Sequence, residues 1–271
     1  RKVIVISAFE HHAILDPVEW LAEDEGAEII QIPILSSGVI DLEYFKKVIS
    51  ERAGDIALVS VMHSNNEVGS LQPISEIVKI ANEFKIPVHS DAVQSFGKVP
   101  FSFAKLGLTA ATLSGHKIGG PLGIGILILK RGLEITPILH GGGQEREIRS
   151  GTLNAPSIVA FATAAKESYD AKKIAALRDS FISGVKRLIP DAYINGEKSD
   201  RLPGIVNVTF PGTQSDTLLL LLDGAHVSAS TGSACSAGVH EASHVLLAMG
   251  HTEETAQSSL RFSFGSTSTQ G

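Results

Sequence analysis

Ser114-Gly-His-Lys-Ile-Gly-Gly-Pro-Leu-Gly-Ile-Gly125 sets a lysine between a short apolar run and a glycine-rich loop. Gly115, Gly119 and Gly120 permit close backbone approach to a ligand, and Ser114 and His116 offer short polar groups to an anion. A loop lysine is usually only solvated, but a positioned, partly desolvated lysine forms Schiff bases with carbonyl compounds. The Walker order Gly-x4-Gly-Lys-Ser/Thr is absent. The stretch therefore predicts an anion-binding loop in which Lys117 is a candidate reactive group.

Short apolar runs alternate with helical patterns on both sides of this loop. The expected strands are Val3 to Ile6, Glu28 to Pro33, Ile56 to Met62, Pro87 to His89, Ala110 to Leu113 and Gly125 to Leu129. The expected helices are Pro17 to Glu25, Leu42 to Arg52 and Pro73 to Phe84. This alternation is typical of parallel β/α units, so we expect an α/β fold with a mostly parallel sheet in residues 1–168.

A second domain is expected in residues 169–271. A long helical pattern from Asn154 to Leu188 leads into it. The elements expected there are a strand at Ile205 to Phe210, a helix at Ser215 to Leu222, a strand near Val227 and a helix at Ala242 to Met249. We therefore expect a smaller C-terminal α+β domain.

Composition and charge narrow the class of protein. The net charge of −6 and the lack of a long basic run argue against direct nucleic-acid binding. The apolar runs are much shorter than the roughly 20 residues of a membrane span, so we expect a cytoplasmic protein that does not enter a membrane. Cys235 is the single cysteine, so it cannot form an intrachain disulfide. It is a small buried hydrophobe, an inert surface thiol or a reactive group.

A second polar segment, His89 to Ser95, directly follows an expected strand. It would lie near the carboxyl edge of the sheet, where open α/β sheets bind ligands. Asp91 in this segment could simply cap the next helix. The functional alternative is that Asp91 pairs with a protonated pyridine nitrogen of a cofactor.

Eight motifs in this order resemble the class V aminotransferase-like enzymes, and among them the cysteine desulfurases of the housekeeping and nitrogen-fixation kind. The motifs are Glu10-His-His-Ala-Ile-Leu-Asp16, Asn65-Asn-Glu-Val-Gly69, Asp91 to Gln94, Ser114-Gly-His-Lys117, His140-Gly-Gly-Gly-Gln-Glu-Arg146, Arg149-Ser-Gly-Thr152, Ser230-Thr-Gly-Ser-Ala-Cys235 and Ser258-Ser-Leu-Arg261. The resemblance implies the aspartate-aminotransferase-like fold of type I pyridoxal-phosphate enzymes. Since that family carries a further segment before the position of Arg1, the resemblance also implies that an N-terminal part is missing.

The resemblance implies a pyridoxal-phosphate site. Lys117 would hold the cofactor as a Schiff base, while Asp91 and Gln94 would contact its pyridine nitrogen and phenolic oxygen. Ser114 and His116 are the implied phosphate ligands. We expect no metal ion at this site.

The remaining roles also come from the resemblance. His11 would stack on the cofactor ring and carry a proton, although it could be a purely structural histidine. Asn66 would lie beside the cofactor and the substrate carboxylate, and Thr152 would reach the phosphate of a partner subunit. Arg261 would bind the substrate carboxylate, its alternative being a surface arginine in a strand. Cys235 lies among small polar residues typical of a mobile loop and would receive the sulfur.

The implied reaction converts L-cysteine to L-alanine and leaves a persulfide on Cys235. A homodimer is implied, and the sulfur acceptor would be an iron–sulfur scaffold protein or a tRNA-thiolation enzyme. The alternatives are a selenocysteine lyase, another class V pyridoxal-phosphate enzyme, or a non-catalytic truncated scaffold in sulfur transfer.

Overall fold

The main sheet has six strands in the order β2-β1-β3-β4-β5-β6. A computed structural model describes residues 1–167, 169–232 and 242–270. The strands are β1 (Val3–Ser7), β2 (Glu28–Ile32), β3 (Ile56–Ser60), β4 (Val88–Asp91), β5 (Ala110–Ser114) and β6 (Gly125–Leu129). The pairs from β2 to β5 are parallel, which confirms the mostly parallel sheet. β6 is antiparallel to β5, because residues 115–124 are too few for a parallel crossover.

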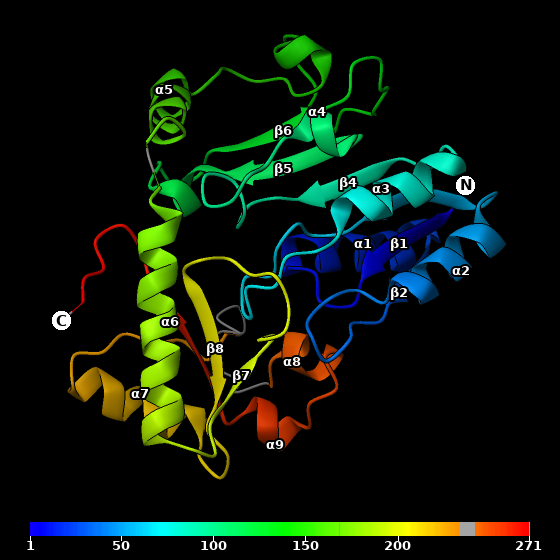
Figure 1. Cartoon of the computed structure of the whole chain (residues 1–271). Coiled ribbons are helices and arrows are strands. Elements are labelled where there is room, and N and C mark those ends of the chain that lie inside the picture. Colours follow the sequence, from blue (N-terminus) through cyan, green and yellow to red (C-terminus); the bar gives the residue numbers. More distant parts are fainter. Residues whose placement is uncertain (168, 233–241, 271) are drawn as a thin grey trace.

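Helices pack against this sheet (Figure 1). They are α1 (His12–Glu25), α2 (Leu42–Arg52), α3 (Ile74–Glu83) and the short α4 (Phe103–Leu106). α2 has the predicted bounds, and Asp41 caps it by accepting hydrogen bonds from the N–H groups of Glu43 and Tyr44. α1 begins five residues earlier than predicted and contains Pro17.

The long helical pattern of residues 154–188 is two helices, not one. After the 3₁₀ turns η1 (Gly115–Ile118) and η2 (Glu145–Glu147) come α5 (Ala155–Ala164) and α6 (Ala171–Leu188). Asp170 starts α6, because its side chain accepts a hydrogen bond of 3.0 Å from Lys173 N. α6 runs from the main sheet down along the small one (Figure 1).

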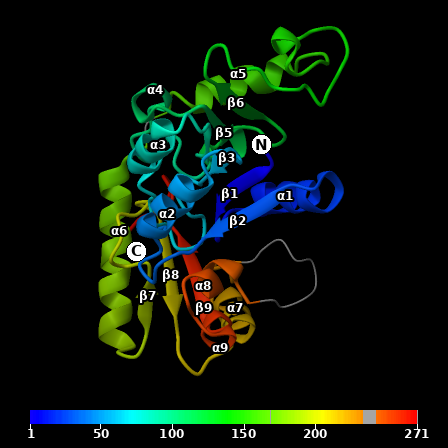
Figure 2. The same ribbon diagram turned by 90° about the vertical axis from the view of Figure 1, so that its right-hand side faces the viewer.

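The small sheet is antiparallel, in the order β7-β8-β9. Its strands are β7 (Tyr193–Asn195), β8 (Ile205–Thr209) and β9 (Ser259–Ser263), and its helices are α7 (Ser215–Gly224), α8 (His244–Ala248) and α9 (Glu253–Ala256). Figure 2 shows β8 and β9 with α6 on one side and α7 on the other. Val206, Val208, Leu260 and Phe262 form its buried core.

The predicted strand near Val227 is wrong. Val227 N donates 2.8 Å to Leu222 O at the end of α7, so it cannot join a strand ladder. Of the described residues after α7, only Ser230 pairs with β9, through an isolated bridge to Arg261. The division into domains at residues 168 and 169 stays a prediction.

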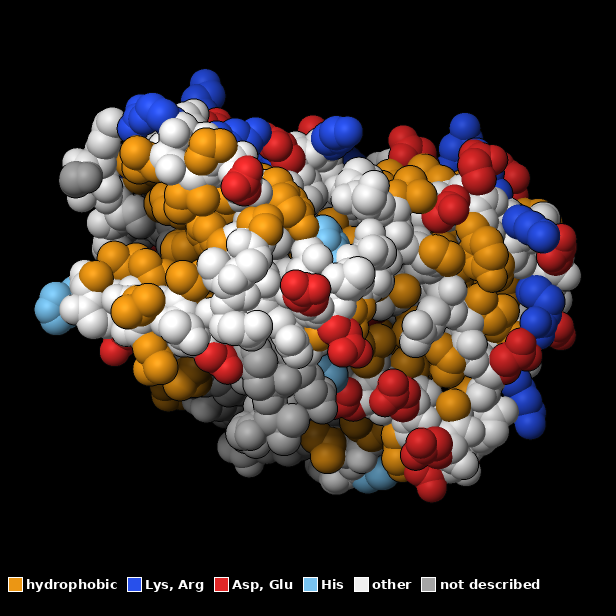
Figure 3. Space-filling view, turned by 90° about the horizontal axis from the view of Figure 1, so that it is seen from below, with side chains coloured by type: hydrophobic (Ala, Val, Ile, Leu, Met, Phe, Trp, Pro, Cys, Tyr) orange, Lys and Arg blue, Asp and Glu red, His pale blue; other side chains and the backbone are white. Residues whose placement is uncertain are grey.

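α7 keeps part of its apolar surface in solvent. Figure 3 shows hydrophobic side chains gathered on the left of the lower face, where α7 lies in Figure 1. Leu220 and Leu221 of α7 are 76% and 66% exposed. Even so, none of the helices in the described residues is long and apolar enough to cross a membrane.

Candidate active site

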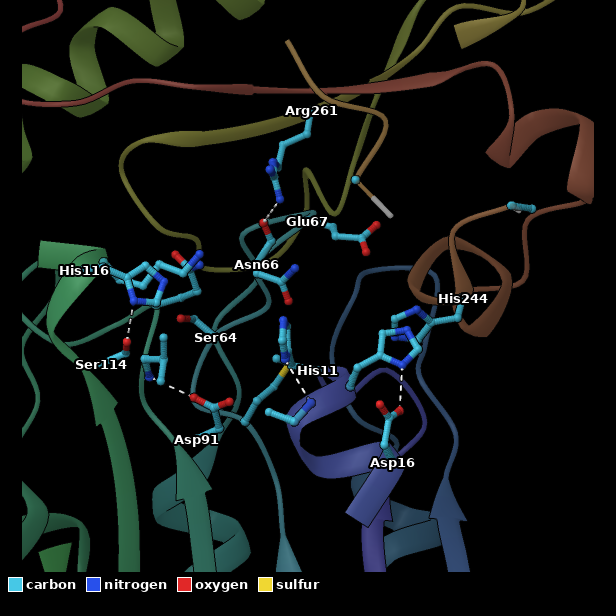
Figure 4. Close-up of a pocket in the computed structure, with 18 residues that line it drawn as sticks. His11, Asp16, Ser64, Asn66, Glu67, Asp91, Ser114, His116, His244 and Arg261 are labelled. Atoms are coloured by element: carbon cyan, nitrogen blue, oxygen red, sulfur yellow. Dashed lines mark hydrogen bonds and ion pairs between the residues drawn. The ribbon is translucent and has the colours of Figure 1, made fainter. Parts of the chain in front are cut away.

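The predicted site residues meet at the carboxyl edge of the main sheet. Because β1, β3, β4 and β5 are parallel, the segments that follow them meet at one edge. A cavity of about 520 Å³ opens there, and Figure 4 shows its lining side chains. Eight predicted residues line it: His11, Asn66, Asp91, Gln94, Ser114, His116, Lys117 and Arg261.

Two predicted site residues remain, one outside this cavity and one outside the described residues. Thr152 is exposed and is not among its lining residues. Cys235 lies outside the described residues. The roles of both stay predictions.

Asp91 is the last residue of β4 and is buried. Its Oδ1 accepts a hydrogen bond of 2.9 Å from Val93 N, so it does cap the following turn. Among the described residues, Oδ2 has no hydrogen-bond partner. Burial raises the pKa of Asp91, whereas the Val93 hydrogen bond and the charges of His11 and Lys117 lower it. A cation placed at Oδ2 would stabilise the ionised carboxylate further.

His11 is the N-cap residue of α1. Its Nδ1 accepts a hydrogen bond of 3.0 Å from Ala13 N, which fixes the ring at the cavity wall. Burial lowers the pKa of His11, so the neutral ring is favoured. Since Nδ1 accepts, the neutral ring carries its proton on Nε2.

The loop after β5 carries Lys117 in η1. Ser114 Oγ and His116 Nδ1 lie 2.8 Å apart, and Figure 4 shows them side by side at the cavity. The loop's glycines serve its own packing: a Cβ on Gly115 would lie 2.8 Å from Ile124 Cγ2, and one on Gly120 would lie 2.9 Å from Gly115 O. These glycines therefore allow a close approach within the chain, and their predicted part in ligand approach stays a prediction.

Arg261 reaches the cavity from β9. Its Nη1 donates a hydrogen bond of 3.1 Å to Asn66 O. Its Nε is buried without a hydrogen-bond partner in the described part of the chain. No carboxylate there lies within 4.0 Å of the guanidinium. Arg261 is thus a cavity-facing cation that can receive an anion, and not a surface arginine.

Sequence reasoning missed several polar residues of the cavity, above all Glu67 and His244. Glu67 follows Asn66 in a quoted motif, so its position in the chain was a usable signal. His244 gave no such signal, because its Nε2 meets Glu10 O across 234 residues of sequence. His12 also lines the cavity, and its Nδ1 lies 2.9 Å from Asp16 Oδ1.

A comparison with protein families identifies the family to which these cavity residues belong. The model for aminotransferase class-V matches residues 1–271. The chain belongs to this family.

The relatives of this class V chain include cysteine desulfurases. It is 45% identical to an IscS-like cysteine desulfurase of Mycobacterium tuberculosis, over 100% of this chain and 70% of the relative. It is 37% identical to the cysteine desulfurase NifS of Azotobacter vinelandii, over 100% of this chain and 67% of the relative. A solved NifS-like protein superposes with a TM-score of 0.89 at 38% identity, covering 99% of this chain and 71% of the other.

Pyridoxal phosphate is the general cofactor of class V aminotransferases, and the residues of this cavity fit it. Oδ2 of Asp91 is open to a cationic ring nitrogen. The hydroxyl of Ser114 and the imidazole of His116 lie together in the loop that carries Lys117. Both groups can donate hydrogen bonds to a phosphate. Lys117 lines the same cavity and can bind an aldehyde.

Proposed function

We propose that this chain is a cysteine desulfurase that depends on pyridoxal phosphate. The observation that carries the proposal is that one cavity gathers the carboxylate of Asp91, the amine of Lys117 and the guanidinium of Arg261, which has no carboxylate partner among the described residues. The reaction converts L-cysteine to L-alanine. The thiol of Cys235 becomes a persulfide, so the sulfur atom that leaves the substrate is the one that the enzyme gains.

Each residue has a proposed task. When bound, the cofactor supplies an electron sink for the charge that develops at the substrate Cα. Asp91 holds the ring nitrogen protonated, and Lys117 holds the cofactor before reaction and moves the α-proton once released. Ser114 and His116 bind the phosphate.

The substrate side of the cavity is formed by Asn66, Arg261 and His11. The planar guanidinium of Arg261 suits two-pronged recognition of a carboxylate, and Asn66, whose carbonyl oxygen it contacts, keeps it in place. His11 carries a proton, which its neutral ring with an N–H at Nε2 can donate or exchange. Cys235 attacks the substrate sulfur as a thiolate.

The test of the sulfur step is Cys235→Ser, which replaces a good nucleophile by a hydroxyl that hardly ionises near neutral pH. The variant should bind pyridoxal phosphate and L-cysteine but form no persulfide, seen as no added mass of one sulfur atom, and no alanine above the level of free cofactor. If the variant releases alanine as fast as the wild type, a lyase of the selenocysteine type is the better description.

The chain is further proposed to act as a cytoplasmic homodimer. In support, the apolar side chains of Leu122, Ile138 and Val159 are 81%, 89% and 64% exposed on the segment from residue 121 to α5. This segment projects from the edge of the main sheet (Figures 1 and 2). A second copy would cover these side chains and could bring Thr152 to the phosphate of its site. The test is molar mass by light scattering for the wild type and for Ile138→Asp.

We also propose a protein as the sulfur acceptor, either an iron–sulfur scaffold or a tRNA-thiolation enzyme. The resemblance to cysteine desulfurases supports both. Incubating protein loaded with radioactive sulfur with each acceptor distinguishes them, because only the true acceptor gains the label that Cys235 loses when the two proteins are mixed at equal concentration.

A further inference from the structure

Gln94 and Lys117 form a wall between two cavities. Both residues line the cavity of about 520 Å³ described above and a second one of about 360 Å³. Lys98 lines the second cavity and is not among the residues that line the first. It therefore lies behind the wall, away from the space assigned to cofactor and substrate.

The turn after β4 brings Lys98 to Gln94. Ser95 N donates to Ala92 O and Lys98 N donates to Ser95 O, so the chain coils here much like a helix. Lys98 Nζ then donates a hydrogen bond of 3.0 Å to Gln94 Oε1. Gly97, with a φ of +75°, allows the tight turn between them.

This hydrogen bond fixes which way the Gln94 amide faces. An ammonium group donates and cannot accept, so it must meet the oxygen of the amide and not the nitrogen. The Nε2 group is left as a donor, and it has no acceptor among the residues that the structure describes. Because Gln94 also lines the first cavity, that donor is available to a ligand there.

Lys98 is an unusual residue for a purely structural role. In the described parts of the chain, no carboxylate lies within 4.0 Å of its amine. Burial and, to a smaller extent, the nearby charge of Lys117 together lower the pKa of Lys98 to about 8. Placing an ammonium group where it has no counter-ion costs stability, so its one hydrogen bond to Gln94 calls for a functional explanation.

We propose that Lys98 is a positioning residue that holds the Gln94 amide so that Nε2 donates to the phenolic oxygen of pyridoxal phosphate. The proposal rests on the function proposed above. Lys98 itself does not touch the cofactor. It acts through Gln94, and it excludes the flipped amide, whose oxygen would repel the phenolic oxygen.

The test compares Lys98→Met, which keeps the length of the side chain but removes the donor, with Lys98→Arg, which keeps a donor. An exposed lysine of α4 provides the matched control Lys105→Met. Pyridoxal phosphate is titrated into each apoprotein, and its dissociation constant and visible absorption band are recorded. For Lys98→Met we expect the dissociation constant to rise roughly three- to tenfold and the band to shift. Lys98→Arg and Lys105→Met should resemble the wild type.

Two further measurements separate positioning from structure. The apoprotein of Lys98→Met should melt no lower than the wild type, because methionine replaces a poorly compensated cation. In a Gln94→Ala background, Lys98→Met should change neither the dissociation constant nor the band, because the two residues act through one contact. A Lys98→Met effect of equal size in that background, or no effect in the wild type, overturns the proposal.

The same experiment distinguishes this inference from the proposed function. If the wild type binds pyridoxal phosphate at Lys117 while Lys98→Met is unchanged, only the role of Lys98 is wrong. If the wild type does not bind pyridoxal phosphate, both are wrong.

Discussion

Ser243 Oγ donates a hydrogen bond of 2.5 Å to Glu67 Oε2, across 176 residues of sequence. The same oxygen would lie 2.5 Å from a Cβ on Gly232, whose φ of +94° also disfavours any side chain there. Glu67 thus contacts both flanks of residues 233–241, the segment that includes Cys235. Burial raises the pKa of Glu67, and the Ser243 hydrogen bond opposes that rise. The carboxyl group therefore links the segment after β3 to the N-terminus of α8.

This relationship predicts that Glu67 and Ser243 are energetically coupled. Glu67→Ala, Ser243→Ala and the double variant form a cycle that can be measured by urea unfolding. We expect a coupling free energy of about 1–2 kcal/mol, as for a buried hydrogen bond. Ser243 also caps α8, because its Oγ accepts a hydrogen bond from Leu246 N. The free energy lost with this cap is the same in both variants that lack Ser243, so it cancels in the cycle. Additive effects of the two single changes would show that the contact contributes nothing.

Arg261→Lys should raise KM for L-cysteine more than it lowers kcat. The lysine keeps the charge but loses the planar pair of donors, which we expect to cost roughly ten- to a hundredfold in KM. Cysteamine, which lacks the carboxylate, should be affected far less, and Arg187→Lys on the exposed end of α6 serves as control. Equal losses for cysteine and cysteamine would mean that Arg261 does not bind the carboxylate.

Lys117→Ala should abolish covalent attachment of pyridoxal phosphate while leaving the fold intact. The side chain is exposed in a short 3₁₀ turn, so the free energy of unfolding should change by no more than about 0.5 kcal/mol. Borohydride reduction and peptide mapping of the wild type check the assignment. An adduct on any other lysine would contradict it.

Glu10→Gln should flatten the pH dependence of stability. Burial raises the pKa of Glu10 to about 8, although its Oε1 accepts hydrogen bonds from Ser7 Oγ and Met62 N. The folded protein therefore keeps a proton that the unfolded chain has lost above its own pKa near 4.5. The stability that this group contributes is complete below pH 4.5 and declines as the pH rises toward 8.

The best window for this measurement is pH 6.5 to 8, because it avoids the titration of His89, whose pKa burial lowers to about 4 from 6.5. There the wild type should lose up to about 1.4 kcal/mol per pH unit relative to Glu10→Gln. Glu76→Gln on the exposed face of α3 is the matched control. Parallel curves for the wild type and Glu10→Gln would show that Glu10 is ionised in the folded protein.

The fold of the first half was predictable because its signals are local. α2 was predicted with its observed bounds, since Asp41 and the apolar spacing of its helix are both written in adjacent residues. The direction of β6 was not predictable in this way, because an apolar run reads the same in a parallel and an antiparallel strand. The strand near Val227 failed for a different reason: its apolar character was visible, but the hydrogen bond of its N–H to Leu222 O at the end of α7 was not.

In the candidate site, too, local signals were predictable and long-range contacts were not. Asp91 ends one strand and Lys117 follows the next, so the carboxyl-edge rule places them together without any knowledge of the fold's details. The roles of Glu67, Lys98 and His244 depend on contacts that local patterns do not encode. Lys98 is a partial exception, since its partner Gln94 is four residues away, but the burial that makes the pair informative comes from distant elements.

The position of Arg261 on β9 has a consequence for the order in which the molecule can form. Its guanidinium donates a hydrogen bond to Asn66 O across 195 residues of sequence. This contact is therefore among the least local in the fold, and forming it requires the closure of a long loop. During synthesis, β4 with Asp91 and the turn η1 with Lys117 leave the ribosome well before β9 has been translated. A nascent chain can therefore build the floor of the cavity while the wall that bears Arg261 does not yet exist.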